Sequence, residues 1–194
     1  MNRALASSIA AASIWAAPIP SMPAWAFDAS SIVPATGTIE FAFTPGDDAA
    51  GLVIRAIDAA RLQVLVQAFS FTHEKIAAAL NRAHRRGIDV QVLVDPQQVE
   101  LIDHNVVGLL KAAKVPVFTD GMHSAAHNKI VLIDAREEQP VLVTGSFNFT
   151  FAAQYRNAEN LLVIRGNREL ARAYLDNWER HRAHSVPFNS ATEH

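Results

Sequence analysis

The sequence predicts an α/β sandwich in which helices cover both faces of a mixed, largely parallel sheet. From residue 38 onward, short β-rich runs alternate with stretches whose apolar residues recur at helical spacing. Half of the 194 residues are hydrophobic, so the chain can bury a sizeable core. The rhythm changes in the second half, where two short strands flank a charged turn, as in a hairpin. Parallel strands are therefore expected first and an antiparallel pair later.

The first half predicts strands and helices in turn. Residues 38–43 alternate with a period of two, which is typical of a strand. Residues 47–60 have a helical spacing and begin at Asp47 or Asp48, either of which can act as the N-cap. The expected elements that follow are strands over 62–69, 88–94 and 115–118 and helices over 73–86 and 99–113.

The second half predicts a hairpin and a closing helix. Two strands, 129–133 and 141–144, are separated by the charged turn 134–140. A further strand is expected over 159–164 and a final helix over 168–184. One face of that helix is apolar and consists of Leu170, Ala171, Tyr174, Leu175 and Trp178.

The first 26 residues have the order of a secretory signal. Arg3 is their only charged residue, an Ala-rich apolar run follows over 4–17, and the segment ends in Ala24-Trp25-Ala26. A basic start, a short apolar core and a small-x-small site predict cleavage near Ala26, which leaves a domain over 27–194 in the periplasm or outside the cell. The alternative is an N-terminal membrane anchor that is retained, although the run is short for a spanning helix.

Charge and cysteine content limit the function classes. The formal net charge is −2, and loss of Arg3 with the signal would make it −3. This balance is not that of a strongly basic nucleic-acid binder, so any positive field must be local. The chain has no cysteine, which excludes disulfides and thiolate metal sites.

The segment with the clearest chemistry reads H-x-K-x-x-x-x-D, followed by G-S-x-N. It consists of His127, Lys129, Asp134 and then Gly145-Ser146-Phe147-Asn148. Residues two apart on a strand share a face, so the imidazole and the ammonium are expected side by side. If the two strands pair, the hydroxyl and the amide lie at the same end of the sheet.

These side chains suit phosphodiester cleavage without a metal or cofactor. An imidazole can attack phosphorus and form a covalent intermediate. An ammonium, a hydroxyl and an amide can donate to the charged transition state, here from Lys129, Ser146 and Asn148. A carboxylate on the other ring nitrogen would hold the histidine in the required tautomer, and Glu159 is the candidate.

The motif resembles that of the phospholipase D superfamily, and the chain is most similar to the small secreted bacterial endonuclease of that superfamily. The similar segments include residues 68–72, 86–90, 144–150 and 157–160. The resemblance implies a phospholipase D-like α-β-α sandwich with His127 as nucleophile. It implies catalytic roles for the set His127, Lys129, Glu159 and Asp134, with Asp134 acting structurally at the strand end, and substrate binding by Lys129, Ser146 and Asn148.

The chain departs from the family's usual pattern in one spacing and from its larger members in the number of motifs. Ten residues, 135–144, separate Asp134 from Gly145, more than is usual in the family. An insertion at a hairpin tip is expected to leave the site intact. Larger members have two motifs, whereas this chain has one, so we expect a homodimer with a shared active site in which one His127 attacks and the other protonates the leaving group.

The expected function is therefore a metal-independent phosphodiesterase that cuts DNA, and also RNA as an open alternative, through a phosphohistidine. The motif itself is equally compatible with a phospholipid or small phosphodiester as substrate. No basic, Trp-bearing amphipathic helix indicates stable membrane association. A non-catalytic binding protein is the third alternative, against which the intact set of chemical groups argues.

Other histidines were weighed as metal ligands. His123 and His127 are four apart, the spacing of a metal pair on a helix, but residues 124–126 do not favour a helix and no third ligand has suitable spacing. The sequence therefore predicts no metal site. His181 and His184, on the last helix, are expected at the surface.

Overall fold

The computed structural model describes residues 30–101 and 106–188. The chain divides into two units, Met1–Ile32 and Val33–His194, and the second contains the fold described below. The predicted signal over 1–26 and the start of the domain at residue 27 lie outside the described residues. None of the described helices combines the length and apolar character that crossing a membrane requires.

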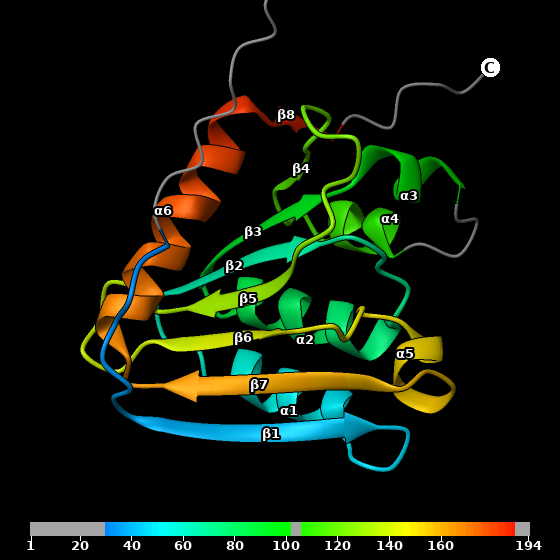
Figure 1. The fold of residues 1–194 in the computed structure, drawn as a ribbon. Helices are drawn as coiled ribbons and strands as arrows, with labels where there is room; N and C mark the ends of the chain where they lie inside the picture. Colours follow the sequence, from blue (N-terminus) through cyan, green and yellow to red (C-terminus); the bar gives the residue numbers. More distant parts are fainter. Residues whose placement is uncertain (1–29, 102–105, 189–194) are drawn as a thin grey trace, which may run out of the picture. The chain divides into compact units, whose positions relative to one another are not determined.

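The described part of the chain forms one eight-stranded mixed sheet in the order β1-β7-β6-β5-β2-β3-β4-β8 (Figure 1). Its strands are β1 (Thr38–Thr44), β2 (Gln63–Ala68), β3 (Asp89–Val94), β4 (Val117–Thr119), β5 (Lys129–Ile133), β6 (Val141–Gly145), β7 (Glu159–Arg165) and β8 (Val186–Pro187). Except for β8, each strand was predicted to within two residues at either end.

The pairing confirms a mixed sheet but shows that "largely parallel" was wrong. Only β2–β3 and β3–β4 are parallel, and the other five neighbouring pairs are antiparallel. The reason is connectivity: β5, β6 and β7 follow one another and pair as an antiparallel meander, and β1 pairs with its free edge. The predicted hairpin is confirmed, with Ile130 opposite Thr144.

Helices pack on both faces of the sheet (Figure 1). Buried residues of α1 (Ala49–Asp58), α2 (Glu74–Arg85) and α4 (Val107–Ala112) share one core cluster with β-strand valines. The long helix α6 (Arg168–His184) covers the other face with Ala171, Leu175 and Trp178. Trp178 also donates its indole N–H to the carbonyl of Val66 at 3.2 Å, which fixes the helix to β2.

The helices differ from the prediction in two places: one long predicted helix is wrong, and one short helix was not predicted. In place of a single helix over 99–113, the structure has α3 (Pro96–Leu101) and α4, and Val106 is the non-helical residue before α4. Val106 is buried, and its amide donates to the carbonyl of Phe71 at 3.2 Å. These contacts with a distant part of the chain hold Val106 out of a continuous helix. The five-residue α5 (Phe151–Tyr155) begins at Thr150, whose hydroxyl caps it.

The central strand β5 is buried along its whole length. Val131 and Ile133 belong to the core under α1 and α2, while Ile130 and Leu132 belong to the core under α6. This two-sided burial is the reason for its uninterrupted aliphatic sequence. The functional polar residues can therefore lie only at its ends.

Asp134 ends β5 and joins it to the start of β2. Its carboxylate accepts backbone hydrogen bonds from Arg61 at 3.0 Å and from Leu62 and Gln63 at 2.8 Å each. Asp134 has a φ of 49°, a left-handed conformation that aspartate tolerates better than most residues. The motif aspartate is thus a structural residue, as the sequence indicated.

We expect Asp134→Ala to lower the free energy of unfolding by about 3 kcal/mol, because three backbone donors lose a charged acceptor. Urea denaturation measures this loss. The exposed Glu138 of the same turn is the matched control, and Glu138→Ala should change stability by less than about 0.5 kcal/mol. Equal stability of the two variants would contradict the structural role of Asp134.

Candidate active site

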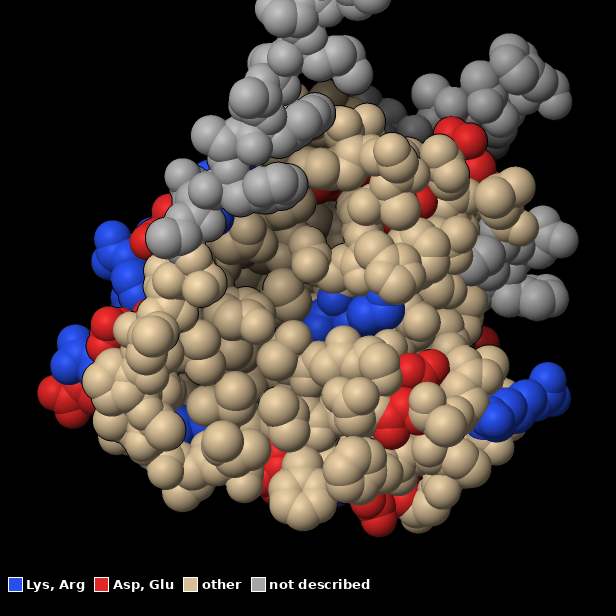
Figure 2. All heavy atoms as spheres, viewed as in Figure 1, with Lys and Arg blue, Asp and Glu red and all other residues tan. Residues whose placement is uncertain are grey.

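A pocket of about 820 Å³ lies where β5 begins and β6 ends. It is lined by His127, Asn128, Lys129, Ile130, Thr144, Gly145, Ser146, Asn148, Glu159, Ala173, Tyr174 and Asn177. The structure therefore brings together every predicted site residue except Asp134, which lies at the opposite end of β5. Figure 2 shows a hollow on this face with a small basic area within it and acidic side chains beside it.

Lys129 and His127 stand next to each other at the start of β5. The Lys129 ammonium donates to the backbone carbonyl of His127 at 2.6 Å. Lys129 is 7% exposed, whereas His127 is exposed at the pocket. The pair thus combines a fixed cation with an accessible imidazole.

Phe69 forms the wall behind this pair. Its ring centroid lies 4.3 Å from that of His127, and the Lys129 ammonium lies 4.9 Å from the same ring. The backbone amide of Phe69 donates to the carbonyl of Asn128 at 3.1 Å. One residue at the end of β2 therefore positions both the imidazole and the ammonium.

The loop that leads into His127 is fixed by Asp95, at the end of β3. Its carboxylate, which is 2% exposed, accepts a hydrogen bond from the amide of Ala126 at 2.8 Å and another from Gln98 at 2.9 Å. The imidazole is therefore held from the residue before it as well as by Phe69. This restraint reduces the motion that would misplace an attacking nitrogen.

The turn after β6 requires glycine at its first position. Gly145 has a φ of 151°, and a Cβ there would lie 2.3 Å from the carbonyl oxygen of Asn160. That same oxygen accepts hydrogen bonds from Ser146 at 3.1 Å and Phe147 at 3.2 Å. The Asn160 amide in turn donates to the Ser146 hydroxyl at 3.0 Å, so β7 holds the serine in place.

Asn148 follows on the same turn, between two fully buried aromatic rings. Phe147 is 0% and Phe149 1% exposed, so the backbone on either side of Asn148 is anchored in the core. Its buried Oδ1 atom has no hydrogen-bond partner among the described residues. This oxygen can accept a hydrogen bond from water or from a donor on a ligand, whereas the side-chain NH2 group is the part of Asn148 that can donate to a phosphate oxygen.

Glu159 lines the pocket but does not contact the histidine of its own chain. Its carboxylate accepts a hydrogen bond from Asn157 at 3.0 Å, and no hydrogen bond joins the described atoms of Glu159 and His127. Burial lowers the pKa of the Lys129 ammonium, and the nearby Glu159 charge opposes this shift. Glu159 therefore acts on Lys129 within the chain, and its predicted contact with the histidine is not made among the described residues.

Two polar residues of α6 that line the pocket escaped the sequence prediction. Tyr174 and Asn177, three apart on α6, face the pocket, although Tyr174 was assigned to the apolar face of that helix. Asn160, which holds the pocket serine without lining the pocket itself, entered the prediction only as part of the 157–160 segment. Adjacency to Glu159 and helical spacing were the available signals, but neither specifies a pocket without the tertiary arrangement.

The arrangement brings together the groups that phosphoryl transfer requires. The exposed imidazole can attack, and the ammonium, hydroxyl and amide can donate to the non-bridging oxygens. Because Lys129 is largely withdrawn from water, its attraction for an incoming phosphate is screened less than that of a surface lysine.

The chain is similar in sequence to several known proteins. The family model described as "Cardiolipin synthase, PLD-like domain" matches residues 53–182. "Phospholipase D" of Rickettsia felis is 38% identical over 136 residues, 70% of this chain and 65% of that protein. The human "Mitochondrial cardiolipin hydrolase" is 33% identical over 135 residues, 70% of this chain and 51% of that protein. The chain thus spans less than two thirds of the length of these two curated relatives.

Solved structures have the same fold. The phospholipase D family member Nuc from Salmonella typhimurium aligns with a TM-score of 0.73 and 29% identity, over 80% of this chain and 100% of that chain. NucT from Helicobacter pylori aligns with a TM-score of 0.70 and 24% identity, over 79% of this chain and 100% of that one.

We expect Phe69→Leu to lower kcat for a small chromogenic phosphodiester, bis(p-nitrophenyl) phosphate, by about 10- to 100-fold, because the imidazole loses the ring that orients it. Initial rates at saturating substrate measure the effect. The buried Phe71 is the control: Phe71→Leu should lower the melting temperature but leave kcat of the folded enzyme nearly unchanged. Full activity of Phe69→Leu would exclude a positioning role for this ring.

Proposed function

Because the chain belongs to the phospholipase D-like superfamily of hydrolases, we propose that it is a metal-independent endonuclease that cleaves nucleic acid through a phosphohistidine. One observation carries the proposal: an exposed imidazole, a buried ammonium, a hydroxyl and a side-chain amide meet in one pocket. Each has the chemistry that attack on a phosphodiester requires.

Two features favour nucleic acid as the substrate. The pocket is open on one face of the sheet, so it can receive an internal phosphodiester of a long polymer as well as a chain end (Figure 2). The single described tryptophan, Trp178, is 4% exposed and packed in the core, so it is not available to anchor the described surface in a lipid interface. The small Nuc structure, covered over its whole length, is consistent with such a compact enzyme.

A phospholipid substrate is the second candidate. It rests on the curated names of the Rickettsia relatives and of the human relative, which refer to lipid hydrolysis. The same four groups would serve that reaction, since both substrates present a phosphodiester with one negative charge. The two candidates therefore differ in what surrounds the pocket and not in its chemistry.

The reaction needs two histidines, and one chain provides one motif. In the proposed step a ring nitrogen of His127 attacks phosphorus and the bond to the leaving oxygen breaks. The His127 of a second copy gives that oxygen its proton. Water then attacks the phosphohistidine, loses a proton to the second histidine, and frees the first.

The exposed face of β1 is the proposed dimer interface. Ile39, Phe41 and Phe43 alternate along this edge strand and are 60%, 61% and 58% exposed. They lie opposite Ile164, Leu162 and Asn160 of β7, and Asn160 holds the pocket serine. An apolar surface on the strand next to β7, which supplies Glu159 to the pocket, would bring two pockets together about a two-fold axis. We further propose export to the periplasm or beyond, on the basis of residues 1–26.

Purified mature protein should nick plasmid DNA in excess EDTA, because the proposed chemistry needs no metal. His127→Ala should lower the rate by at least about 1,000-fold, since it removes both the nucleophile and the acid. Agarose-gel assays of supercoiled plasmid measure this. Single-stranded RNA and vesicles of phosphatidylglycerol and cardiolipin are assayed in parallel.

The outcomes separate the two candidates. Cutting by wild type in EDTA, together with inactivity on vesicles, supports the nuclease. Hydrolysis of vesicle lipid without nucleic-acid cleavage, by folded dimeric protein, would replace the nuclease with the lipid hydrolase.

Phe41→Asp should convert the dimer to a monomer and abolish turnover, because a charge enters the apolar interface and the second histidine is lost. Sedimentation equilibrium gives the mass. The matched control is Leu109→Asp on α4, where the leucine is similarly exposed at 51%. That variant should stay dimeric and active. Monomeric wild-type protein with full activity would refute the shared site.

A further inference from the structure

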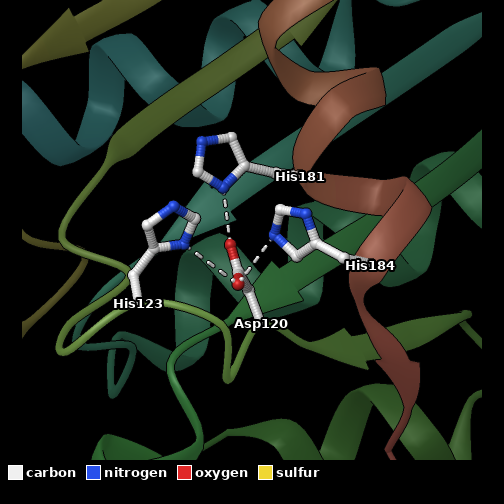
Figure 3. A group of neighbouring side chains, drawn as sticks. All are labelled: Asp120, His123, His181 and His184. Atoms are coloured by element: carbon white, nitrogen blue, oxygen red, sulfur yellow. Dashed lines mark hydrogen bonds and ion pairs between the residues drawn. The ribbon is translucent and has the colours of Figure 1, made fainter. Parts of the chain in front are cut away.

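Four side chains that line no part of the pocket converge near the C-terminal end of α6 (Figure 3). Asp120 and His123 come from the loop after β4, and His181 and His184 come from the last turns of α6. Figure 3 shows the three imidazole rings arranged around the Asp120 carboxylate, each with a ring nitrogen directed toward it. Neither histidine of α6 is the freely exposed residue that the sequence predicted, because their side chains are only 16% and 22% exposed.

The separations suit a single small cation. One ligand atom from each residue lies within 4.8 Å of all the others. From the Asp120 carboxylate, the ring nitrogens lie at 2.5 Å in His181, 3.0 Å in His184 and 3.4 Å in His123. Neighbouring ligand atoms of tetrahedral zinc are about 3.3 Å apart, given zinc–nitrogen bonds of about 2.0–2.1 Å. Two of the three separations are near this value, and the shortest needs to widen by less than an ångström.

The charges favour a metal over a cluster of protonated histidines. The ring centroids lie 4.9 to 5.5 Å from one another, so two or three imidazolium ions here would repel one another. The Asp120 side chain is 1% exposed and its negative charge needs compensation. A single divalent cation compensates it while all three imidazoles stay neutral.

The sequence spacing is also that of a metal site. Asp120 and His123 are three apart, and so are His181 and His184. Residues three apart on a helix lie on the same face. Two short segments that each give two ligands are the usual plan of structural zinc sites, and four protein ligands leave no position open for a substrate.

We propose that Asp120, His123, His181 and His184 form a structural zinc site. The ion would join the end of α6 to the loop after β4. That loop reaches His127 only four residues after His123, and its Ala126 amide is already fixed by Asp95. Zinc would therefore hold the first part of the loop, as Asp95 holds its end, while leaving the phosphodiesterase chemistry free of metal. The pair His123 and His127 weighed from the sequence is not the pair that meets, since residues 123–127 form no helix.

The test uses full mature protein without a histidine tag, stripped of metal and titrated with zinc against a chromophoric chelator. We expect one zinc per chain, and cobalt in its place should give the strong visible absorption of a tetrahedral complex. His184→Ala should weaken zinc affinity by more than the roughly 10- to 100-fold typical of losing an outer-shell partner. His123→Ala should do the same without harming the fold, because its side chain is 47% exposed.

Two controls isolate the site. His84→Ala, on α2 and outside the cluster, and His127→Ala, in the pocket, should both keep one tight zinc per chain. Zinc should also raise the melting temperature of wild type but not of His184→Ala. No zinc binding by folded wild type in the micromolar range, or equal affinity in wild type and His123→Ala, would overturn the proposal and leave a hydrogen-bonded cluster. Neither result depends on nuclease activity.

Discussion

The antiparallel pairing of β5 with β2 on one side and β6 on the other is the constraint on which the rest of the structure depends. It buries five consecutive side chains and leaves polar groups only at the two strand ends. Asp134 lies at the C-terminal end of β5 and holds the start of β2. Lys129 and His127 lie at the N-terminal end, beside the turn that follows β6. The spacing of the motif therefore puts the structural Asp134 at one end of β5 and the pair of His127 and Lys129 at the other.

Much of this could be predicted from the sequence, because the signals are local. The aliphatic run from Ile130 to Ile133 indicates β5, and the two-residue spacing of His127 and Lys129 indicates that they share a face. The glycine that ends β6 and the serine after it indicate the turn. Pairing as a hairpin then places Ser146 near Lys129 without further information. The α-β-α arrangement follows from the alternation of helical and strand periods. The prevalence of antiparallel pairs does not, because the position of β1 beside β7 depends on contacts more than a hundred residues apart.

The sequence does not predict contacts between residues that lie far apart in the chain and come together only in the folded protein. Phe69 reads as one more apolar residue at a strand end, yet its ring contacts both His127 and Lys129. His181 and His184 read as surface residues of an amphipathic helix until the loop after β4 places Asp120 against them. In both cases the identity of the residue is compatible with several environments, and the tertiary fold selects one. The break between α3 and α4 has the same origin, since it follows from packing around Val106.

The position of α6 bears on how the protein is made. All the motif groups precede this helix in the chain, yet Ala173, Tyr174 and Asn177 close one side of the pocket. The same helix ends at the histidines that contact the loop before His127. A ribosome-bound chain that lacks α6 would therefore carry the complete motif without a complete pocket. Assembly of the pocket would therefore await the last helix of the fold, although every group of the motif is already present before it.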